Sequence, residues 1–173
     1  MSTLTDQPSD FGNIIEYLEE ESGVDIDSFS DFQNIIDKHQ WCLHDVDINL
    51  LSVRVALVYF DENARMFLES KNPDIDIKEE INNIEPGYHP LMAAVIRMNY
   101  DHATFLLGNG ANPNQGTEPW FPLLQADSNS DLKMIQLLEN FGADWDSNIK
   151  IYEHWNKEVF NKPDQKYIKK TKA

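Results

Sequence analysis

Part of this chain is repeated further along at a constant spacing, and the repetition limits the possible folds more than any single residue does. The matching pairs are Pro90 with Pro122, Ala94 with Ala126, and Gly110 with Gly142. A copied unit of about 33 residues is typical of solenoids, in which neighbouring helical hairpins stack and bury a continuous core. The chain is therefore predicted to be all-α, a solenoid of stacked helix-turn-helix units, and stacks of this kind bind other molecules more often than they catalyse reactions.

Each clear copy is predicted to contain two short helices. Pro90 suits the first position of a helix, where its missing N–H has no intrahelical acceptor and its fixed φ already matches the helix. Apolar residues then follow at helical spacing through the first helix, and Phe105 and Leu106 mark the buried side of the second. Gly110 is expected to end the second helix in the left-handed conformation, and Gly142 does the same in the next copy.

A third, degenerate copy precedes these two. Placing Ser52 on Pro90 keeps the frame and puts Asn72 at the position of the closing glycine. The connection after this copy is longer than its counterpart, so Ile75 to Pro86 is expected to form an enlarged loop. The predicted repeats span about residues 47–76, 85–114 and 117–146.

The two ends of the chain are predicted to flank the stack. Degenerate amphipathic helices are expected within residues 11–44, with the first ending at Gly23. A capping helix is expected over residues 150–160, because a solenoid needs a polar outer face at its end. Residues 1–160 then form a single domain, and the lysine-rich residues 161–173 form a flexible tail.

The charge balance favours a basic partner. The chain has 14 Lys and Arg residues against 30 Asp and Glu residues, a net charge of −16, and residues 150–173 hold half of the basic ones. Nucleic acid and anionic membranes would be repelled, so neither is expected as a direct partner. Cys42 is the only cysteine, and no secretory signal or membrane-spanning apolar run occurs, so a cytoplasmic location is expected.

No pattern of residues indicates catalysis. The five histidines lack metal-ligand spacing, and no phosphate-binding glycine loop occurs. Segments 45–49 and 144–148 begin like calcium loops but lack the glycine and glutamate that such a loop needs, so 144–148 is interpreted as a turn. Catalytic residues, cofactor and metal are therefore all predicted to be absent.

The segment from His89 to Asn114 resembles an ankyrin repeat, whose hallmark is T-P-L-H-x-A followed later by L-L-x-x-G-A-D/N. The matching residues are Pro90, Leu91, Ala94, Leu106, Gly110, Ala111 and Asn112, and in the next copy Pro122, Leu123, Ala126, Leu137, Leu138, Gly142, Ala143 and Asp144. The resemblance is specific over about residues 80–146. The hallmark Thr is replaced by His89 and Phe121, and the hallmark His by Met92 and Leu124, so a less regular stack is expected.

The ankyrin resemblance also implies a binding surface, formed by the loop tips and the exposed positions of each first helix. Carried over position by position, it comprises Tyr59, Glu85, Tyr88, Ile96, Arg97, Glu118, Trp120, Ser128 and Asn129. Tyr, Trp and Arg are the residue types most enriched among binding hot spots. The alternative is that Tyr88 and Trp120 pack against their own hairpins, as aromatic side chains often do.

Together these features predict a non-catalytic protein–protein interaction module. In size, acidity and lack of catalytic residues the chain is similar to bacterial immunity proteins, which implies an inhibitor that neutralises a basic cognate toxin. Two alternatives remain open. One is an ankyrin scaffold or adaptor, including one directed at a host cell, and the other is an acidic nucleic-acid mimic that blocks a DNA-binding protein.

Overall fold

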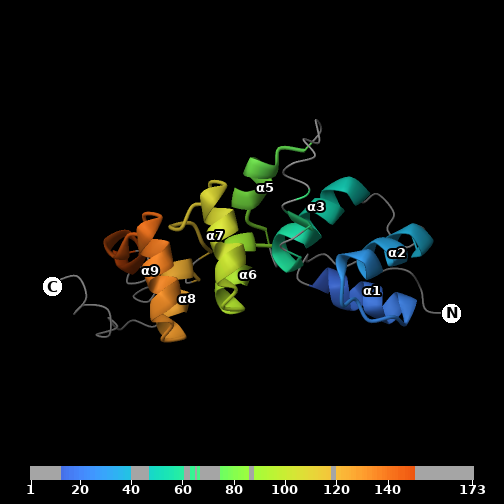
Figure 1. Cartoon of the computed structure of the whole chain (residues 1–173), viewed down its shortest axis with the longest axis horizontal. Helices are drawn as coiled ribbons and strands as arrows, with labels where there is room; N and C mark the ends of the chain where they lie inside the picture. Colours follow the sequence, from blue (N-terminus) through green and yellow to red (C-terminus); the bar gives the residue numbers. More distant parts are fainter. Residues whose placement is uncertain are drawn as a thin grey trace. The chain divides into compact units, whose positions relative to one another are not determined.

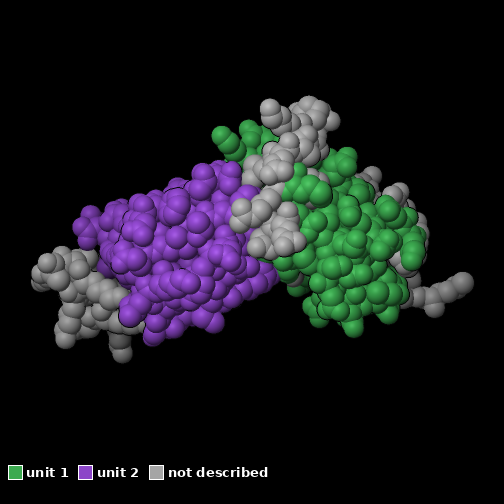
Figure 2. Space-filling view, viewed as in Figure 1, with its two compact units in different colours: residues 1–89 green, residues 90–173 purple. Residues whose placement is uncertain are grey.

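The protein is described by a computed structural model covering residues 13–39, 47–60, 63–64, 66, 75–85, 88–117 and 120–150. Within these residues the regular secondary structure is helical, apart from two isolated β-bridges, which confirms the all-α prediction (Figure 1). The chain divides into two compact units, residues 1–89 and 90–173 (Figure 2). None of the described helices is long and apolar enough to cross a membrane.

The first unit begins with two amphipathic helices that pack on each other, α1 (Ile14–Ser22) and α2 (Phe29–His39). α1 ends at Gly23, whose φ of 67° is left-handed, as the sequence predicted. Ser28 starts α2, because its hydroxyl accepts a hydrogen bond from the Asp31 backbone N–H and donates one to the Asp31 carboxylate. The buried side chains of the two helices are Ile14, Leu18, Phe29, Phe32, Ile35 and Ile36.

Helix α3 (Ile48–Tyr59) differs from the predicted first helix of the degenerate repeat, which was expected to begin at Ser52. It begins earlier because the Asp47 carboxylate accepts hydrogen bonds from the backbone N–H groups of Asn49 and Leu50. The helix is buried over most of its length, and α2 and α5 pack against it. Of the second helix expected in this repeat, Ala64 is helical and buried, whereas residues 67–74 lie outside the described part of the chain.

The enlarged loop expected over residues 75–86 contains a helix instead, α5 (Ile77–Asn82). Asp76 caps it by accepting hydrogen bonds from the N–H groups of Lys78 and Glu79. Ile77 and Ile81 lie one helical turn apart, and both are buried. The loop prediction was wrong because the extra residues include both a capping aspartate and an apolar pair at helical spacing.

The second unit contains two hairpins that repeat each other. Their helices are α6 (Pro90–Ile96), α7 (Tyr100–Gly108), α8 (Pro122–Ser128) and α9 (Leu132–Asn140). Each first helix packs on its own second helix, and both also contact the corresponding helix of the other hairpin. The predicted helix starts at Pro90 and Pro122 are confirmed. A solenoid running through the whole chain stays a prediction.

Backbone details recur with the same period as the sequence. Asn99 caps α7 and Asp131 caps α9, each accepting a hydrogen bond from the N–H three residues later. The residues just before these caps, Met98 and Ser130, have φ values of 53° and 57°. Gly110 and Gly142 have φ values of 97° and 91°, so the left-handed positions predicted for them are confirmed.

The two departures from the ankyrin hallmark in the second hairpin create an apolar contact. Phe121 and Leu124, which replace the hallmark Thr and His, are both buried and pack with Ile149. Trp145 packs on the same cluster. Apolar packing against residues 145–150, which are helical, therefore takes the place of the polar link. The predicted cap over residues 150–160 and the tail over 161–173 lie outside the described residues, apart from residue 150.

Candidate functional site

Two β-bridged turns occupy the positions at which loop tips were predicted. One bridge joins Glu85 to Tyr88 and the other joins Thr117 to Trp120, so the two bridges are equivalent positions of successive repeats. In the first, the Tyr88 N–H donates to the Glu85 carbonyl at 2.8 Å, and the Glu85 N–H donates back at 3.1 Å. The tips themselves, which include the predicted binding residue Glu118, lie outside the described residues.

Tyr88 was expected on the binding surface, but its side chain is fully buried. Its hydroxyl donates a hydrogen bond to the Glu80 backbone carbonyl at 2.8 Å, and the Arg54 guanidinium lies 5.0 Å from the ring centroid. Burial raises the pKa of the Tyr88 hydroxyl above its ordinary range, and the Glu80 carboxylate adds to this rise. Tyr88 therefore packs against α3 and α5, which precede its repeat, and is not part of an exposed surface.

Glu85 is exposed but already bound within the first unit. Both of its carboxylate oxygens accept hydrogen bonds from Arg54, at 2.8 and 2.9 Å, and Arg54 Nε also donates to Glu80 at 2.7 Å. Burial alone would lower the pKa of Arg54, but the hydrogen bonds to the two carboxylates raise it overall. The hydrogen bond from Arg54 also holds the pKa of Glu85 below its ordinary range. Because Arg54 already binds its carboxylate, Glu85 is less able to form an ion pair with a partner.

Trp120 is the one predicted aromatic residue among the described residues of the second unit, and it is exposed. Its accessible surface is 59%. It occupies the same repeat position as Tyr88, just before the proline that opens a first helix. A large aromatic side chain in this position is suited to act as an anchor in a binding interface. Tyr59, the remaining predicted aromatic, is half-buried at the end of α3.

Four further predicted residues lie where the first helices end. Ile96 and Ser128 are the last residues of α6 and α8, and Arg97 and Asn129 follow them. All four are exposed, and Asn129 accepts a hydrogen bond from Gln125 at 3.1 Å. They lie at the opposite end of the short first helices from Trp120, a separation of about 10 Å along the axis. Of the predicted residues that belong to the second unit, Trp120 therefore lies at one edge and these four at the other.

The edge at the helix turns, which we call the turn edge and define as residues 96–99 and 128–133, contains exposed apolar residues that the sequence analysis missed. Met98 is 53% exposed and Leu132 is 78% exposed, beside Ile96 at 55%. Tyr100 links the two turns, because its hydroxyl donates to the Asp131 carboxylate at 3.0 Å. Helical periodicity could have identified Leu132, since the buried positions of α9 are Met134 and Leu138 and Leu132 is out of phase with both.

The second segment that begins like a calcium loop has a structural role. The Asp144 carboxylate accepts hydrogen bonds from the backbone N–H groups of Asp146 and Ser147, and from the Ser147 hydroxyl. These hydrogen bonds lower the pKa of Asp144 below its ordinary range, and the bond from the Ser147 hydroxyl has the largest effect. Asp144 thus caps the helical segment 145–150, so the interpretation of 144–148 as a turn was wrong, because a capping aspartate starts a helix there. No group of metal-ligating side chains occurs among the described residues.

Comparison with known proteins identifies the repeated unit. The family model of the ankyrin repeat matches residues 86–118, which include the first β-bridged turn from its tip onward and the α6–α7 hairpin. No curated protein and no solved structure matches the chain. The match supports an ankyrin-repeat protein, and ankyrin repeats are typically modules for binding other proteins rather than catalysts.

Proposed function

We propose that this protein is a non-catalytic interaction module that binds a basic protein, and that it acts as an immunity-type inhibitor of a basic cognate toxin. The observation that carries the proposal is the combination of repeated ankyrin-like hairpins with a net charge of −16. Complementary charge accelerates the encounter of two proteins and disfavours acidic competitors. The proposal includes a cytoplasmic location, in keeping with the single cysteine.

The exposed side chains of the second unit support an interface with two kinds of contact. Trp120 provides an aromatic anchor at one edge, and Ile96, Met98 and Leu132 provide apolar area at the turn edge. The same unit also exposes acidic side chains, among them Asp101 at the start of α7, three positions after Met98. Specific interfaces usually combine apolar and charged contacts.

The proposal is tested by purifying the tagged full-length chain from its native cell and identifying any stoichiometric partner. We expect a basic protein whose association rate falls steeply as the salt concentration rises, because exposed charges are screened. Trp120→Ala should weaken this complex by about tenfold or more. An acidic partner, or no stoichiometric partner, would count against the proposal. Inhibition of the partner's activity by the purified chain tests the immunity role itself.

The acidic nucleic-acid mimic makes a different prediction. A mimic depends on a ridge of carboxylates, so reversing the charge of Glu20 and Glu21 on α1, both exposed, should weaken binding while Trp120→Ala should not. The proposed inhibitor shows the opposite ranking. Glu20 and Glu21 are better sites for this test than Glu85, because reversing Glu85 also breaks its contact with Arg54. A scaffold or adaptor would bind its partner without inhibiting any activity.

A further inference from the structure

Helix α2 carries a stripe of polar side chains beside its buried face. The stripe consists of Ser30, Gln33, Asn34 and Asp37, which are spaced at i, i+3, i+4 and i+7 and so follow one side of the helix. The buried face is formed by Phe29, Phe32, Ile35 and Ile36. The stripe is not needed to hold the core of the first unit together.

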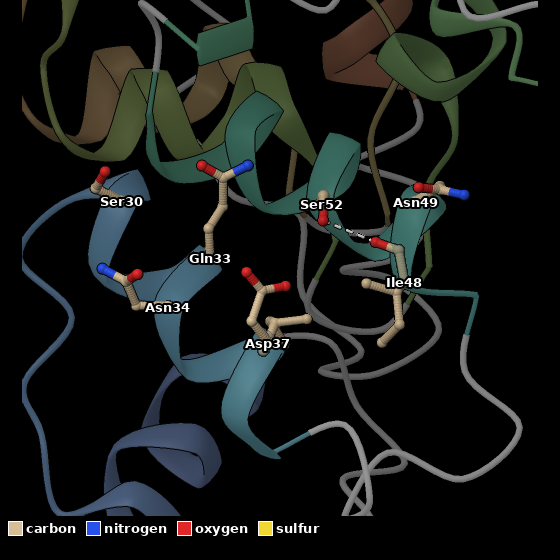
Figure 3. Close-up of a pocket in the computed structure, with 8 residues that line it drawn as sticks. Ser30, Gln33, Asn34, Asp37, Ile48, Asn49 and Ser52 are labelled. Carbon is tan, nitrogen blue, oxygen red and sulfur yellow. Dashed lines mark hydrogen bonds between the residues drawn. The ribbon is translucent and has the colours of Figure 1, made fainter.

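This stripe forms one wall of a groove between α2 and α3. The groove has a volume of about 360 Å³, and Ile36, Ile48, Asn49 and Ser52 complete its lining. That volume is at the small end of the range for ligand pockets in proteins. Figure 3 shows Gln33 and Asp37 reaching from α2 toward α3, where Ser52 lies. All of these residues belong to the first unit.

The polar groups of the stripe have hydrogen-bonding capacity to spare. In the part of the chain that the structure describes, the side chains of Gln33, Asn34 and Asp37 make no hydrogen bond or ion pair. Across the groove, Ser52 donates its hydroxyl proton to the Ile48 carbonyl at 2.7 Å, so its oxygen remains an acceptor. Carboxylate, amide and hydroxyl oxygens therefore all occur in the lining of one groove, whose stripe residues are also exposed to solvent.

Among the described residues that line the groove, the charge has one sign. Asp37 is the only ionisable one of these residues, and none of them is Lys, Arg or His. The start of α3 does not attract an anion, because Asp47 already accepts the hydrogen bonds of the first N–H groups. A cation with several donors is thus the complementary ligand. Guanidinium has five donors in a plane, and it can bind the carboxylate in a bidentate manner while reaching nearby amide oxygens.

We propose that the groove between α2 and α3 binds an arginine side chain presented by the basic partner. This inference rests on the proposed function, and it names the chemical group that the acidic chain recognises. Asp37 forms the ion pair, Gln33 and Asn34 accept further guanidinium donors, and Ile48 contacts the aliphatic part of the side chain. The site belongs to the first unit, whereas the exposed apolar residues described above belong to the second.

The test uses the full-length chain and the two capped amino acids N-acetyl-arginine amide and N-acetyl-citrulline amide. Citrulline has nearly the same shape as arginine without its charge. Binding is followed by amide chemical shifts in a titration monitored by NMR. With the arginine compound we expect saturable shifts at the groove residues. The citrulline compound should bind more weakly by about tenfold or more. Asp37→Asn should reduce arginine binding about tenfold, whereas Asp25→Asn, an equal charge change at an exposed residue outside the groove, should not.

Several outcomes would overturn the inference. These are equal binding of arginine and citrulline, shifts confined to residues outside the groove, or equal effects of Asp37→Asn and Asp25→Asn. The inference would also be overturned if lysine amide acetylated on its α-nitrogen binds as tightly as the arginine compound, because the groove would then recognise charge alone. Circular dichroism of both variants verifies that they fold.

The two proposals fail in different ways. If the native partner binds the Asp37→Asn variant as tightly as the unchanged chain, the groove inference fails and the proposed function stands. If arginine binds the groove but no basic protein associates with the chain, recognition of the guanidinium group by the groove stands, whereas the proposed function fails and with it the source named for the arginine.

Discussion

At the scale of single residues, Tyr88 and Trp120 show how one repeat position can have two roles. They are equivalent residues of successive repeats, and each forms the second half of a β-bridged turn. Tyr88 is buried because Glu80 offers a carbonyl acceptor for its hydroxyl and Arg54 lies over its ring. Trp120 remains 59% exposed. One aromatic therefore stabilises a turn and the other is available to a partner.

The contact between Glu85 and Arg54 predicts a pH-dependent stability. Because the folded-state pKa of Glu85 is below its unfolded value, its contribution to stability is present at neutral pH. That contribution is lost as the pH falls through the folded-state pKa, when the carboxylate is protonated. Glu85→Gln should thus lower the free energy of unfolding at pH 7, and the difference from the unchanged chain should shrink below about pH 4.

Urea denaturation at a series of pH values measures this difference. Glu79→Gln is the matched control, because Glu79 is exposed and has no ion-pair partner among the described residues. A pH-independent difference between Glu85→Gln and the unchanged chain would contradict the prediction.

At the scale of elements, the boundaries of the repeated helices follow from local chemistry. Pro90 and Pro122 start the first helices, and Asn99 and Asp131 cap the second ones. Helix α5 follows the same rules, because Asp76 caps it. It was not predicted, because it lies in a segment that was expected to be a loop. A capping residue followed by an apolar i, i+4 pair is thus a usable signal even in a segment that falls outside the repeat frame.

The closing glycines give a prediction at this scale. A Cβ added to Gly110, Gly142 or Gly108 would meet no atom within 4 Å, so crowding does not distinguish the three. Only Gly110 and Gly142 have positive φ, whereas Gly108 is the last residue of α7. Gly110→Ala and Gly142→Ala should each lower the free energy of unfolding by about 1 kcal/mol. Gly108→Ala should leave it unchanged or raise it by about 0.5 kcal/mol.

Thermal or chemical denaturation of the three variants distinguishes backbone strain from loss of packing. Equal destabilisation at Gly108 and Gly110 would show that the left-handed conformation is not the cause.

At the scale of the whole molecule, neighbouring repeats are joined through their loops as well as their helices. Asn114, which follows the first closing glycine, donates to the Gly142 carbonyl at 2.8 Å and accepts from the Asp144 N–H at 2.7 Å. Its side-chain oxygen also accepts from Asn148 at 2.9 Å. One side chain thus ties the end of the first hairpin to the end of the second. The stability of a repeat protein depends strongly on such contacts between neighbours.

Asn114→Ala should therefore lower the free energy of unfolding by about 1–3 kcal/mol, because partly buried hydrogen-bonding groups lose their partner. Asn140→Ala is the control, since Asn140 is exposed and accepts a single weak hydrogen bond from Gln136 at 3.3 Å. Its effect should stay within about 0.5 kcal/mol. A similar small effect at Asn114 would mean that packing between the helices alone joins the two hairpins.

The sequence by itself determined the period, the helix starts and the left-handed turns of the two clear hairpins. These features were predictable because proline, glycine and capping side chains act on the backbone within a few residues of their own position. The resemblance to an ankyrin repeat came from the same local pattern, and the family match over residues 86–118 agrees with it.

Only the tertiary structure decided which side chains remain available. The burial of Tyr88, the engagement of Glu85 and the groove beside Asp37 depend on residues distant in sequence, such as Arg54, which is 31 positions from Glu85. The period is the same whether an aromatic at the turn is covered or exposed. The aromatic side chain is buried only if a helix packs beside it. Long-range contacts determine which helix does so, and a local sequence pattern does not contain them.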